Sequence, residues 1–469
     1  MSTPVLHTLS DSAPVGRNAL SRISSWFKHR VASGPVEGVA GGVVRAWCRE
    51  LEACAREQGG PVASRSRALA LIDLYEAMNE ATRLEALRAF ATTLKPDGAA
   101  VTQAFAAYSE ALGSPAEWRA ESALRGALAS PRARVIRQFG AAEKGVRFLV
   151  DVRVEVLARL RQAPELQALE AELAEQLAVW FDVGFLELRR IGWDSPAHIL
   201  EKLMVYEAVH EISSWADMKN RLDRDRRVYA FFHPRLKDEP LVFVEVALTE
   251  DIAGNVQVLL DQAAPVFDTR RARAAMFYSI SSTQAGLRGI SFGNFLLKRV
   301  VEDLQRDFPK LQHFSTLSPM PGFAAWLKAA PNVPLPLSEA LANPHWHQDS
   351  ALAGALRAPL MSLAALYLTE ARQAPSGRPD AGPAAPLDSV ARFHLGNGAR
   401  AERLQWLADG SARGLLQSFG MMVNYYYDLE EIEGNINRFD AEGFVAAGSR
   451  LARLARIATR MREEAAAKR

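Results

Sequence analysis

The chain has 469 residues, of which 49% are hydrophobic, and its 56 Lys and Arg residues against 54 Asp and Glu residues leave a net charge of only +2. This length and apolar content predict a soluble globular protein of about two to three domains. The near-neutral balance excludes a broad basic surface for a nucleic acid backbone, so any phosphate recognition must be local.

The N-terminal residues 1–35 are expected to form a flexible tail, because they lack the hydrophobic core of a secretory signal and only weakly imitate a basic transit segment. The two cysteines, Cys48 and Cys54, are six residues apart, so on a helix they would point away from each other and would not form a disulfide. A reducing compartment follows, and the C-terminal residues 467–469 do not form a Ser-Lys-Leu peroxisomal signal. We therefore expect a cytoplasmic protein, and since no stretch approaches roughly 18 consecutive apolar residues, we expect no membrane segment.

Residues 36–183 are predicted to form an all-α bundle. Apolar residues such as Leu69, Ile72 and Tyr75 recur at helical spacing, and prolines interrupt the pattern at intervals. No group of His, Asp or Glu in this region has the spacing of a metal site or an acid–base pair. The region is therefore interpreted as a packing and oligomerisation domain.

Residues 184–469 change to alternating strands and helices. Two β-rich runs, Val228–His233 and Leu241–Thr249, predict a strand pair. Residues 373–387 are rich in Pro, Gly and Ala and predict a surface loop within this domain, since the strand pattern resumes at Phe393–Ala399 and Gly420–Tyr427. Helices are expected at Gly293–Phe308, Gly322–Ala329, Ala351–Arg372 and Ala441–Arg462. The fold class is thus α+β, an N-terminal all-α bundle followed by a mixed α/β catalytic domain.

The segment Phe277–Phe323 combines a strand, a glycine loop, a helix and a second strand that ends at Ser318. A glycine loop before a helix directs backbone N–H groups outward, which suits a phosphate or pyrophosphate. The loop consists of Arg288, Gly289, Ile290, Ser291, Phe292, Gly293 and Asn294. An ordinary strand-to-helix turn that needs Gly289 and Gly293 for backbone freedom would have the same sequence.

Several separated blocks resemble the malonyl-CoA decarboxylase family. They cover roughly the last three fifths of the chain, more than one short motif could supply by accident. The blocks are Trp180–Phe185, Val244–Thr249, Phe277–Phe323, Phe393–Ala399 and Asn424–Tyr427. The resemblance implies a catalytic domain like the Gcn5-type N-acetyltransferases (GNAT), a homodimer or homotetramer, and conversion of malonyl-CoA and a proton to acetyl-CoA and CO2 without a cofactor.

The same resemblance assigns site residues. Ser318, in Ser-Pro-x-Pro-Gly-Phe, matches the family's catalytic serine, a proton acceptor, and His394, in Phe-His-Leu-x-Asn-Gly-Ala, matches its catalytic histidine, a proton donor. The loop Arg288–Asn294 resembles the acyl-CoA binding loop, and Ser279 matches a serine of the family's strand. An imidazole with its ordinary pKa of about 6.5 would let His394 deliver a proton near neutral pH, while Ser318 relays a proton or anchors the malonyl carboxylate. A nucleophilic Ser318 is less consistent, because no glycine elbow surrounds it.

The residues alone allow other interpretations. Ser318 before Pro319 also fits a helix N-cap with proline at the first helical position, and His394 fits a hydrogen-bonded strand end. Further candidates for the malonyl group are Ser281, Thr283, Asn424 and Tyr425. Four arginines, Arg221, Arg224, Arg226 and Arg227, could meet a ribose phosphate, but their alternation with Asp223 and Asp225 favours a self-paired solvated face. His345, His347 and Asp349 are interpreted as a polar loop, and no metal is expected.

The sequence therefore predicts a carboxy-lyase that stabilises a thioester enolate. A CoA-dependent acyltransferase using the same cleft, and a non-catalytic acyl-CoA-binding regulator, remain as alternatives. Which residues form the oxyanion hole is left open.

Overall fold

The computed structural model describes residues 37–290, 296–330, 339, 341, 343–374 and 382–467. The predicted tail and the loop residues Ser291, Phe292, Gly293 and Asn294 therefore lie outside the described residues. The chain forms two compact units, the first comprising Met1–Asp182 and Gln284–Ile290 and the second Val183–Thr283 and Ser291–Arg469. Each unit is described by itself.

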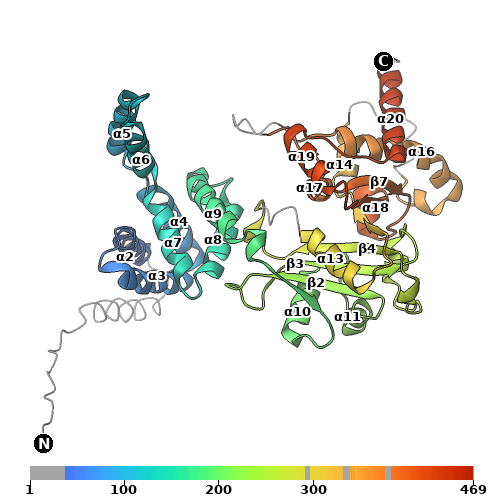
Figure 1. The fold of residues 1–469 in the computed structure, drawn as a ribbon, viewed down its shortest axis with the longest axis horizontal. Coiled ribbons are helices and arrows are strands. Elements are labelled where there is room, and N and C mark those ends of the chain that lie inside the picture. Colours follow the sequence, from blue (N-terminus) through green and yellow to red (C-terminus); the bar gives the residue numbers. More distant parts are fainter. Residues whose placement is uncertain are drawn as a thin grey trace, which may run out of the picture. The chain divides into compact units, whose positions relative to one another are not determined.

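The first unit is helical throughout, which confirms the predicted bundle (Figure 1). Its helices are α2 (Glu37–Ala55), α3 (Gly60–Glu76), α4 (Glu80–Thr93), α5 (Gly98–Ala111), α6 (Glu117–Leu128), α7 (Pro131–Ala141), α8 (Gly145–Arg159) and α9 (Gln167–Trp180), with short 3-10 turns η1 (Pro164–Leu166) and η4 (Ala285–Leu287). Caps set the boundaries: Asn79 accepts from Thr82 N–H before α4, and Ser130 caps α7 directly before Pro131.

Aromatic side chains fill the core of this unit. The rings of Phe139 and Phe148 meet edge to face at 5.3 Å, and Trp47 meets Phe90 in the same way at 6.0 Å. Edge-to-face contacts of this kind stabilise a core beyond the area they bury. The periodic apolar residues identified in the sequence thus provide the packing of the bundle.

The second unit contains an eight-stranded sheet in the order β1-β2-β3-β4-β5-β8-β6, with β7 paired to β8. Among the described strands of this sheet, β4 and β5 pair in parallel and the other pairs are antiparallel. The strands are β1 (Glu187–Ile191), β2 (Arg226–Phe232), β3 (Pro240–Thr249), β4 (Ala274–Ser282), β5 (His313–Thr316), β6 (Ser318–Pro319), β7 (Arg400–Gln405) and β8 (Met422–Tyr426). The predicted strand pair at β2 and β3 is confirmed.

Helices cover this sheet. They are α10 (Ala197–Tyr206), α11 (Trp215–Arg221), α12 (Val256–Leu260), α13 (Leu296–Asp307), α14 (Phe323–Ala329), α16 (Ser350–Glu370), α17 (Ser389–Gly396), α18 (Ala412–Ser418), α19 (Ile432–Glu442) and α20 (Ser449–Ala467), with 3-10 turns η2 (Val183–Phe185), η3 (Thr269–Arg271) and η5 (Trp346–Gln348). Alternate residues of β2 face different helices: Val228 and Ala230 join the apolar cluster with α10 and α11, whereas Tyr229 donates to Asp303 of α13 at 2.9 Å (Figure 1).

Two of the expected elements are wrong. Phe393–Ala399 was expected as a strand, but Phe393 lies in the helix α17, which begins after Asp388 because the Asp388 carboxylate accepts from the N–H groups of Val390 and Ala391. The helix expected at Ala441–Arg462 is interrupted. Instead, α19 ends at Glu442, the φ of 66° at the following Gly443 reverses the chain, and α20 starts only at Ser449.

The segment between α16 and α17 is closed at its base by backbone pairing. Gln373 N–H donates to Ala385 O at 2.9 Å, and Leu387 N–H donates to Ala371 O at 2.9 Å. An isolated antiparallel bridge joins Arg372 to Pro386. The part of the expected surface loop at 375–381 lies outside the described residues.

Helix α16 is long and apolar enough, with a mean hydropathy of 1.5, to cross a membrane by length and composition. More than half of that window, 56%, is already buried, and Trp326 of α14 packs against Tyr367 of this helix. A buried core helix passes the same test, so this finding is weak evidence for a membrane span.

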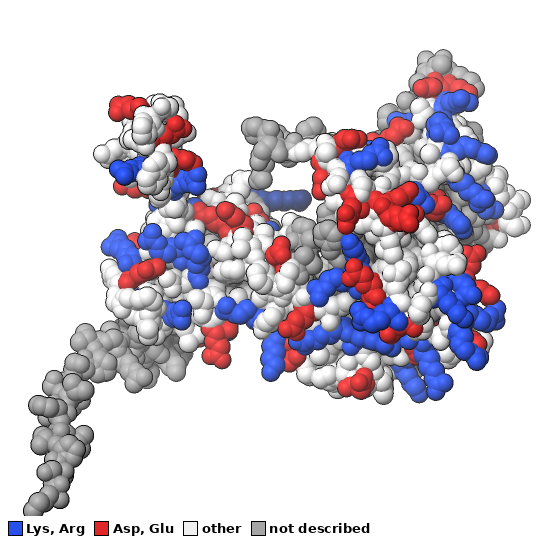
Figure 2. Space-filling view, in the orientation of Figure 1, with Lys and Arg blue, Asp and Glu red and all other residues white. Residues whose placement is uncertain are grey.

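Surface charge is mixed. Figure 2 shows Lys and Arg interspersed with Asp and Glu on the visible face, and neither sign forms a continuous field across it. This distribution agrees with the net charge of +2.

Candidate active site

Ser318 lies where the chain leaves β5 and crosses to β8. Strand β5 ends at Thr316, and Ser318 then pairs with Val423 of β8 as the short strand β6. The alternative of a helix N-cap is wrong, because α14 begins only at Phe323, after Gly322. The serine hydroxyl is instead held inside the sheet, with the residue only 6% exposed.

His394 lies in the last turn of α17 and meets Ser318. Its Nε2 is 2.9 Å from Ser318 Oγ, and its Nδ1 is 2.8 Å from the hydroxyl of Tyr427. The imidazole also stacks on the Tyr425 ring, with centroids 4.5 Å apart and an interplanar angle of 24°. The two residues that the sequence singled out, 76 positions apart, are therefore brought into direct contact, and the strand-end alternative for His394 is wrong.

Burial decides the charge of this histidine. His394 is 3% exposed, and desolvation lowers its pKa to about 3, so the ring is neutral at pH 7. The ordinary pKa assumed from the sequence therefore does not hold for the unliganded site. A carboxylate brought next to the ring would raise this pKa again, because an opposite charge favours the imidazolium.

A chain of hydroxyl groups continues from the histidine. Ser318 Oγ is 2.9 Å from Thr316 Oγ1, which also accepts from Tyr425 N–H at 3.0 Å. A neutral imidazole has one N–H, so it donates either to Ser318 or to Tyr427 and accepts from the other. Tyr427, His394, Ser318 and Thr316 thus form a hydrogen-bonded row, along which a proton can move without leaving a lasting charge on the imidazole. Neither Tyr427 nor Thr316 was predicted to have a role, although Tyr427 ends one of the resembling blocks.

Asp388 fixes both segments that carry the pair. Its carboxylate caps α17 and accepts from Tyr367 Oη at 3.0 Å and, at 3.5 Å, from Gly322 N–H in the turn after Ser318. A Cβ at Gly322 would lie 2.3 Å from the Tyr367 hydroxyl, so glycine is needed for this approach. Burial raises the pKa of Asp388. This residue, which sequence reasoning missed, ties the Ser318 turn to the His394 helix.

Strands β4 and β5 separate beside Ser318. Their parallel ladder runs only to Phe277 and Thr316, and Leu317 N–H donates to Phe277 O at 3.0 Å, whereas β4 continues to Ser282. Within the described ladders, the end of β4 therefore has no partner strand on this side. Such an unpaired strand edge accepts extended ligands that carry amide groups.

Ser279, predicted to contact substrate, lies on this part of β4 but does not join the Ser318–His394 pair. Its hydroxyl donates to the Glu207 carboxylate at 2.7 Å, and Ser281 Oγ donates to the same carboxylate at 3.1 Å. Glu207 also accepts from the N–H groups of Val209 and His210. Both serines therefore fix the loop after α10 in this structure.

The other polar candidates also have structural contacts. Asn424 Nδ2 donates to Thr316 O at 2.7 Å and to Ala253 O at 3.1 Å, while Thr283 Oγ1 donates to Leu241 O at 3.2 Å. Tyr425 differs, because its hydroxyl is buried and has no hydrogen-bond partner in the part of the chain that the structure describes. It is a spare donor beside His394.

The segment before the predicted CoA loop belongs to the helical unit. Arg153 of α8, which is 4% exposed, donates to Gly286 O at 2.7 Å and to Arg288 O at 2.9 Å, and pairs with Glu170 at 2.7 Å. Gly289 has a φ of 78°, so glycine is favoured there, and its neighbour Ile290 is buried. The remaining loop residues, Ser291 to Asn294, lie outside the described residues.

The predicted solvated arginine face is wrong for two of its members. Arg221 is 2% exposed and pairs with Glu245 at 2.7 Å and Asp217 at 3.1 Å, and Arg226 pairs with Asp225 at 3.0 Å, with both partners buried. A charged residue remains buried only when it is paired in this way. Arg224 is exposed and Arg227 is half-buried.

The segment His345–Asp349, expected as a polar loop, leads directly into the helix α16. Residues Trp346–Gln348 make a 3-10 turn, and the Asp349 carboxylate caps α16 by accepting from Ala351 N–H at 2.9 Å. Among the described residues, no group of three or more His, Cys, Asp or Glu could hold a metal ion.

Two protein-family models match the chain. Residues 184–467 match the family model of the malonyl-CoA decarboxylase C-terminal domain, and residues 94–181 match that of its N-terminal domain. The mitochondrial malonyl-CoA decarboxylase of Mus musculus is 40% identical over 350 residues, which cover 68% of this chain and 69% of that protein. The corresponding protein of Anser anser anser is 37% identical over 340 residues, covering 65% and 66%.

Solved structures are similar as well. The crystal structure of malonyl-CoA decarboxylase from Rhodopseudomonas palustris has a TM-score of 0.78 at 41% identity and covers 87% of this chain and 99% of its own. That from Agrobacterium vitis has a TM-score of 0.79 at 41% identity, with the same coverage. The predicted helical region followed by a GNAT-like domain is thus confirmed, and the chain belongs to the malonyl-CoA decarboxylase family.

Proposed function

We propose that this chain converts malonyl-CoA and a proton to acetyl-CoA and CO2, with Ser318 and His394 as the catalytic residues. The observation that carries the assignment of these residues is the buried hydrogen bond of 2.9 Å between Ser318 Oγ and His394 Nε2, beside the point where β4 and β5 separate. The family membership supplies the reaction.

The reaction breaks the bond between C2 and the carboxylate carbon. Its electron pair moves into the thioester carbonyl, giving an enolate and CO2, and C2 then takes up a proton. One well-placed donor to the enolate oxygen is worth roughly 3 kcal/mol. The hydroxyl of Ser318, the imidazole of His394 and the unpartnered hydroxyl of Tyr425 are the donors available for this role.

Burial favours the departure of CO2. A carboxylate loses hydration when it enters a dry site, while neutral CO2 needs none, so the charged ground state is disfavoured relative to the dispersed charge of the transition state. His394 is neutral before substrate binds, takes up from solvent the proton that the reaction consumes once the malonyl carboxylate lies beside it, and then gives this proton to C2. We assign Ser318 to anchoring or relay rather than to nucleophilic attack, because Nδ1 of His394 meets the hydroxyl of Tyr427 and not a carboxylate.

The CoA part would use two further features. The pantetheine arm is an extended chain with two amide groups, and it fits the unpaired edge of β4 from Ser279 to Ser282 as an added strand. The pyrophosphate is assigned to the loop Arg288–Asn294, which resembles the family's acyl-CoA binding loop.

The deciding experiment incubates the purified protein with malonyl-CoA alone. Prompt release of CO2 with stoichiometric acetyl-CoA supports the decarboxylase. Product that appears only after an amine or acyl carrier protein is added would indicate the acyltransferase, and tight binding without turnover would indicate the regulator. Either of the last two results would remove the proposal.

We also propose that the chain self-associates as a homodimer or homotetramer through α5 and α6. Neither helix contributes a buried residue, and the pair exposes Phe105 at 59% and Trp118 at 64%. Exposed apolar groups gathered in this way are typical of interaction sites. Light scattering should show a smaller species for Phe105→Ser/Trp118→Ser, whereas Val62→Ser, which changes an exposed apolar residue on α3 rather than on α5 or α6, should leave the mass unchanged. Equal masses for the wild type and both variants would contradict an interface at α5 and α6.

For localisation we propose the cytoplasm. Cys48 and Cys54 both lie on α2 without a disulfide, and burial raises the pKa of Cys54 to about 11, which keeps it as a thiol. Fractionation of the producing cells tests this proposal, and recovery of the protein in an organelle or envelope fraction would contradict it.

A further inference from the structure

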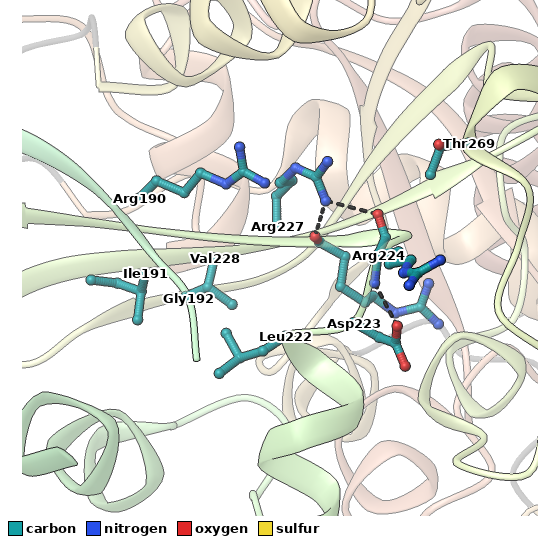
Figure 3. Close-up of a pocket in the computed structure, with 10 residues that line it drawn as sticks. Arg190, Ile191, Gly192, Leu222, Asp223, Arg224, Arg227, Val228 and Thr269 are labelled. Carbon is teal, nitrogen blue, oxygen red and sulfur yellow. Dashed lines mark hydrogen bonds between the residues drawn. The ribbon is translucent and has the colours of Figure 1, made fainter. Parts of the chain in front are cut away.

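The second unit, which contains the sheet, has a polar hollow away from Ser318 and His394. It has a volume of about 410 Å³ and lies beside the β1–β2 edge of the sheet (Figure 3). Four of its lining residues are arginines, Arg190, Arg224, Arg226 and Arg227, and its remaining charged residue is Asp223. Pockets of this volume are large enough for a small metabolite.

Two of the four guanidinium groups are already neutralised. Arg226 pairs with the buried Asp225 at 3.0 Å, and Arg190 pairs with Asp307 at the end of α13 at 3.0 Å. The Arg190–Asp307 pair is half exposed, with 47% and 37% of the two side chains accessible, so it is easily exchanged for another anion.

The other two make no salt bridge with any described residue, although the charges of Asp307 and Asp225 act on Arg227. Arg227 donates only to backbone carbonyl oxygens, those of Arg224 at 2.8 Å and of Arg226 at 2.6 Å, and its buried Nε has no hydrogen-bond partner among the described residues. The exposed Arg224 makes no ion pair with any described residue.

The geometry holds Arg227 in place without a carboxylate. Its guanidinium lies over the Phe308 ring, 4.8 Å from the centroid, and Figure 3 shows it next to that of Arg190. Burial, and then the neighbouring Arg190, lower the pKa of Arg227. Two like charges held close together with an unused N–H are stabilised by an anion that bridges them.

This hollow is separate from the proposed catalytic site. Across the sheet, Arg226 pairs with Ala247 of β3, Ala247 pairs with Met276 of β4, and Met276 pairs with Ser315 of β5. Three strand spacings between β2 and β5 amount to roughly 14 Å. The predicted CoA loop follows the far end of β4, which runs six residues beyond Met276 to Ser282, roughly 20 Å along the strand.

We propose that this hollow binds the phosphoryl group of a small phosphorylated molecule or of free phosphate. Arg227 Nε and the guanidinium of Arg190 donate to the phosphoryl oxygens, and Arg224 adds a third positive charge at the rim. Arginine suits this ligand because its planar fork matches phosphate geometry. The proposal is independent of the decarboxylase reaction.

The test uses the full-length protein saturated with CoA, so that the proposed substrate site is already occupied. Binding of glycerol 3-phosphate and of inorganic phosphate is measured by calorimetry in a phosphate-free buffer, with glycerol as the uncharged probe. We expect saturable binding of at least one phosphate probe and none of glycerol. Preference for glycerol 3-phosphate would identify an organic phosphate as the ligand, and equal affinities would show that the phosphoryl group alone is recognised.

Variants locate the site. Arg190→Gln/Arg227→Gln should weaken binding by at least about 10-fold, since charge-assisted hydrogen bonds are lost. Arg224→Gln, at an exposed position where folding is not at risk, should weaken it by a few-fold, on the order of one surface charge. Arg306→Gln is the matched control, because it removes the same charge near the end of α13, where Arg306 pairs with Asp303 outside the hollow. Absence of saturable binding in the wild type, or equal affinity in all variants, would overturn the proposal.

Discussion

The two segments expected to handle the substrate are held in very different ways. Ser318 and His394 lie in a dense network within the sheet unit, where Thr316, Tyr427 and Asp388 fix the hydroxyl, the ring and the helix. The segment Gln284–Ile290 belongs to the helical unit, and one buried arginine, Arg153, holds its carbonyl oxygens.

The two kinds of support suit different steps of the reaction. Many short contacts that share partners fix a catalytic geometry to within fractions of an ångström, as bond breaking requires. The segment Gln284–Ile290 is held from α8 by Arg153 and by Arg147, which donates to Gln284 Oε1 at 3.2 Å, and it lies directly before the predicted CoA loop, so it suits binding. We therefore expect changes in the first region to lower kcat and changes in the second to raise KM.

The largest effect is expected from the catalytic pair itself. His394→Ala or Ser318→Ala should each lower kcat by at least 100-fold, roughly the contribution of acid–base help or one oxyanion donor. Steady-state rates of CO2 release measure this decrease in kcat, and circular dichroism checks that each variant is folded. Ser315→Ala is the control, because Ser315 is equally buried in the neighbouring strand but donates to Tyr425 O. Near-normal turnover in both catalytic variants would remove the pair from the mechanism.

The next effect tests the tie between the two catalytic segments. Asp388→Asn keeps the size of the side chain but removes the charge that accepts from Tyr367 and caps α17. We expect kcat to fall by about 10-fold with KM nearly unchanged, because a small displacement of His394 is felt mainly in the chemical step.

The control for this prediction is Asp349→Asn, which alters the same kind of cap on α16. If the two variants lose the same activity, the effect is one of general stability rather than of positioning.

A change in the second region should act on binding. Arg153→Gln leaves the carbonyl oxygens of Gly286 and Arg288 without their charged donor, so we expect KM for malonyl-CoA to rise by about 5- to 10-fold while kcat changes less than twofold. Arg132→Gln removes a comparable buried pair with Glu172 elsewhere in the helical unit and should leave KM unchanged. A loss confined to kcat in Arg153→Gln would contradict the division between the two regions.

The smallest effect is a dependence of stability on pH. The folded pKa of His394, about 3, lies below the ordinary value of 6.5, so the unfolded chain binds the extra proton and the folded state loses stability as pH falls below about 6.5. Between pH 7.5 and pH 5.5 this loss amounts to about 1 kcal/mol. Urea unfolding at both pH values should show this loss of unfolding free energy in the wild type. In His394→Gln the loss should be smaller by the same amount. An identical pH dependence in both proteins would mean that the ring is not held neutral.

Much of this architecture follows from local sequence pattern. The β-rich composition of β2 and β3 and the helical spacing in the first unit are local signals, and both predicted structures are observed. The contact between Ser318 and His394 was expected only through the family resemblance, because residues 76 positions apart share no local signal.

The misjudged residues show where pattern reasoning stops. Phe393–Gly396 has strand-like composition, but the cap at Asp388 makes it helical. Arg221 and Arg226 alternate with acids as exposed residues do, yet tertiary pairing with Glu245 and Asp225 allows their burial. The neutral state of His394 depends on the packing of the Tyr425 ring against it, which no property of the neighbouring sequence reveals.

The closed base between α16 and α17 has a practical consequence. Hydrogen bonds from Gln373 to Ala385 and from Leu387 to Ala371 join the two sides of the chain just before Asp388. Added length beyond this clamp therefore exerts no pull on the helix that carries His394, since loop closure costs grow only slowly with length. A fluorescent protein or an affinity tag spliced between residues 376 and 380 would provide a reporter that leaves turnover intact.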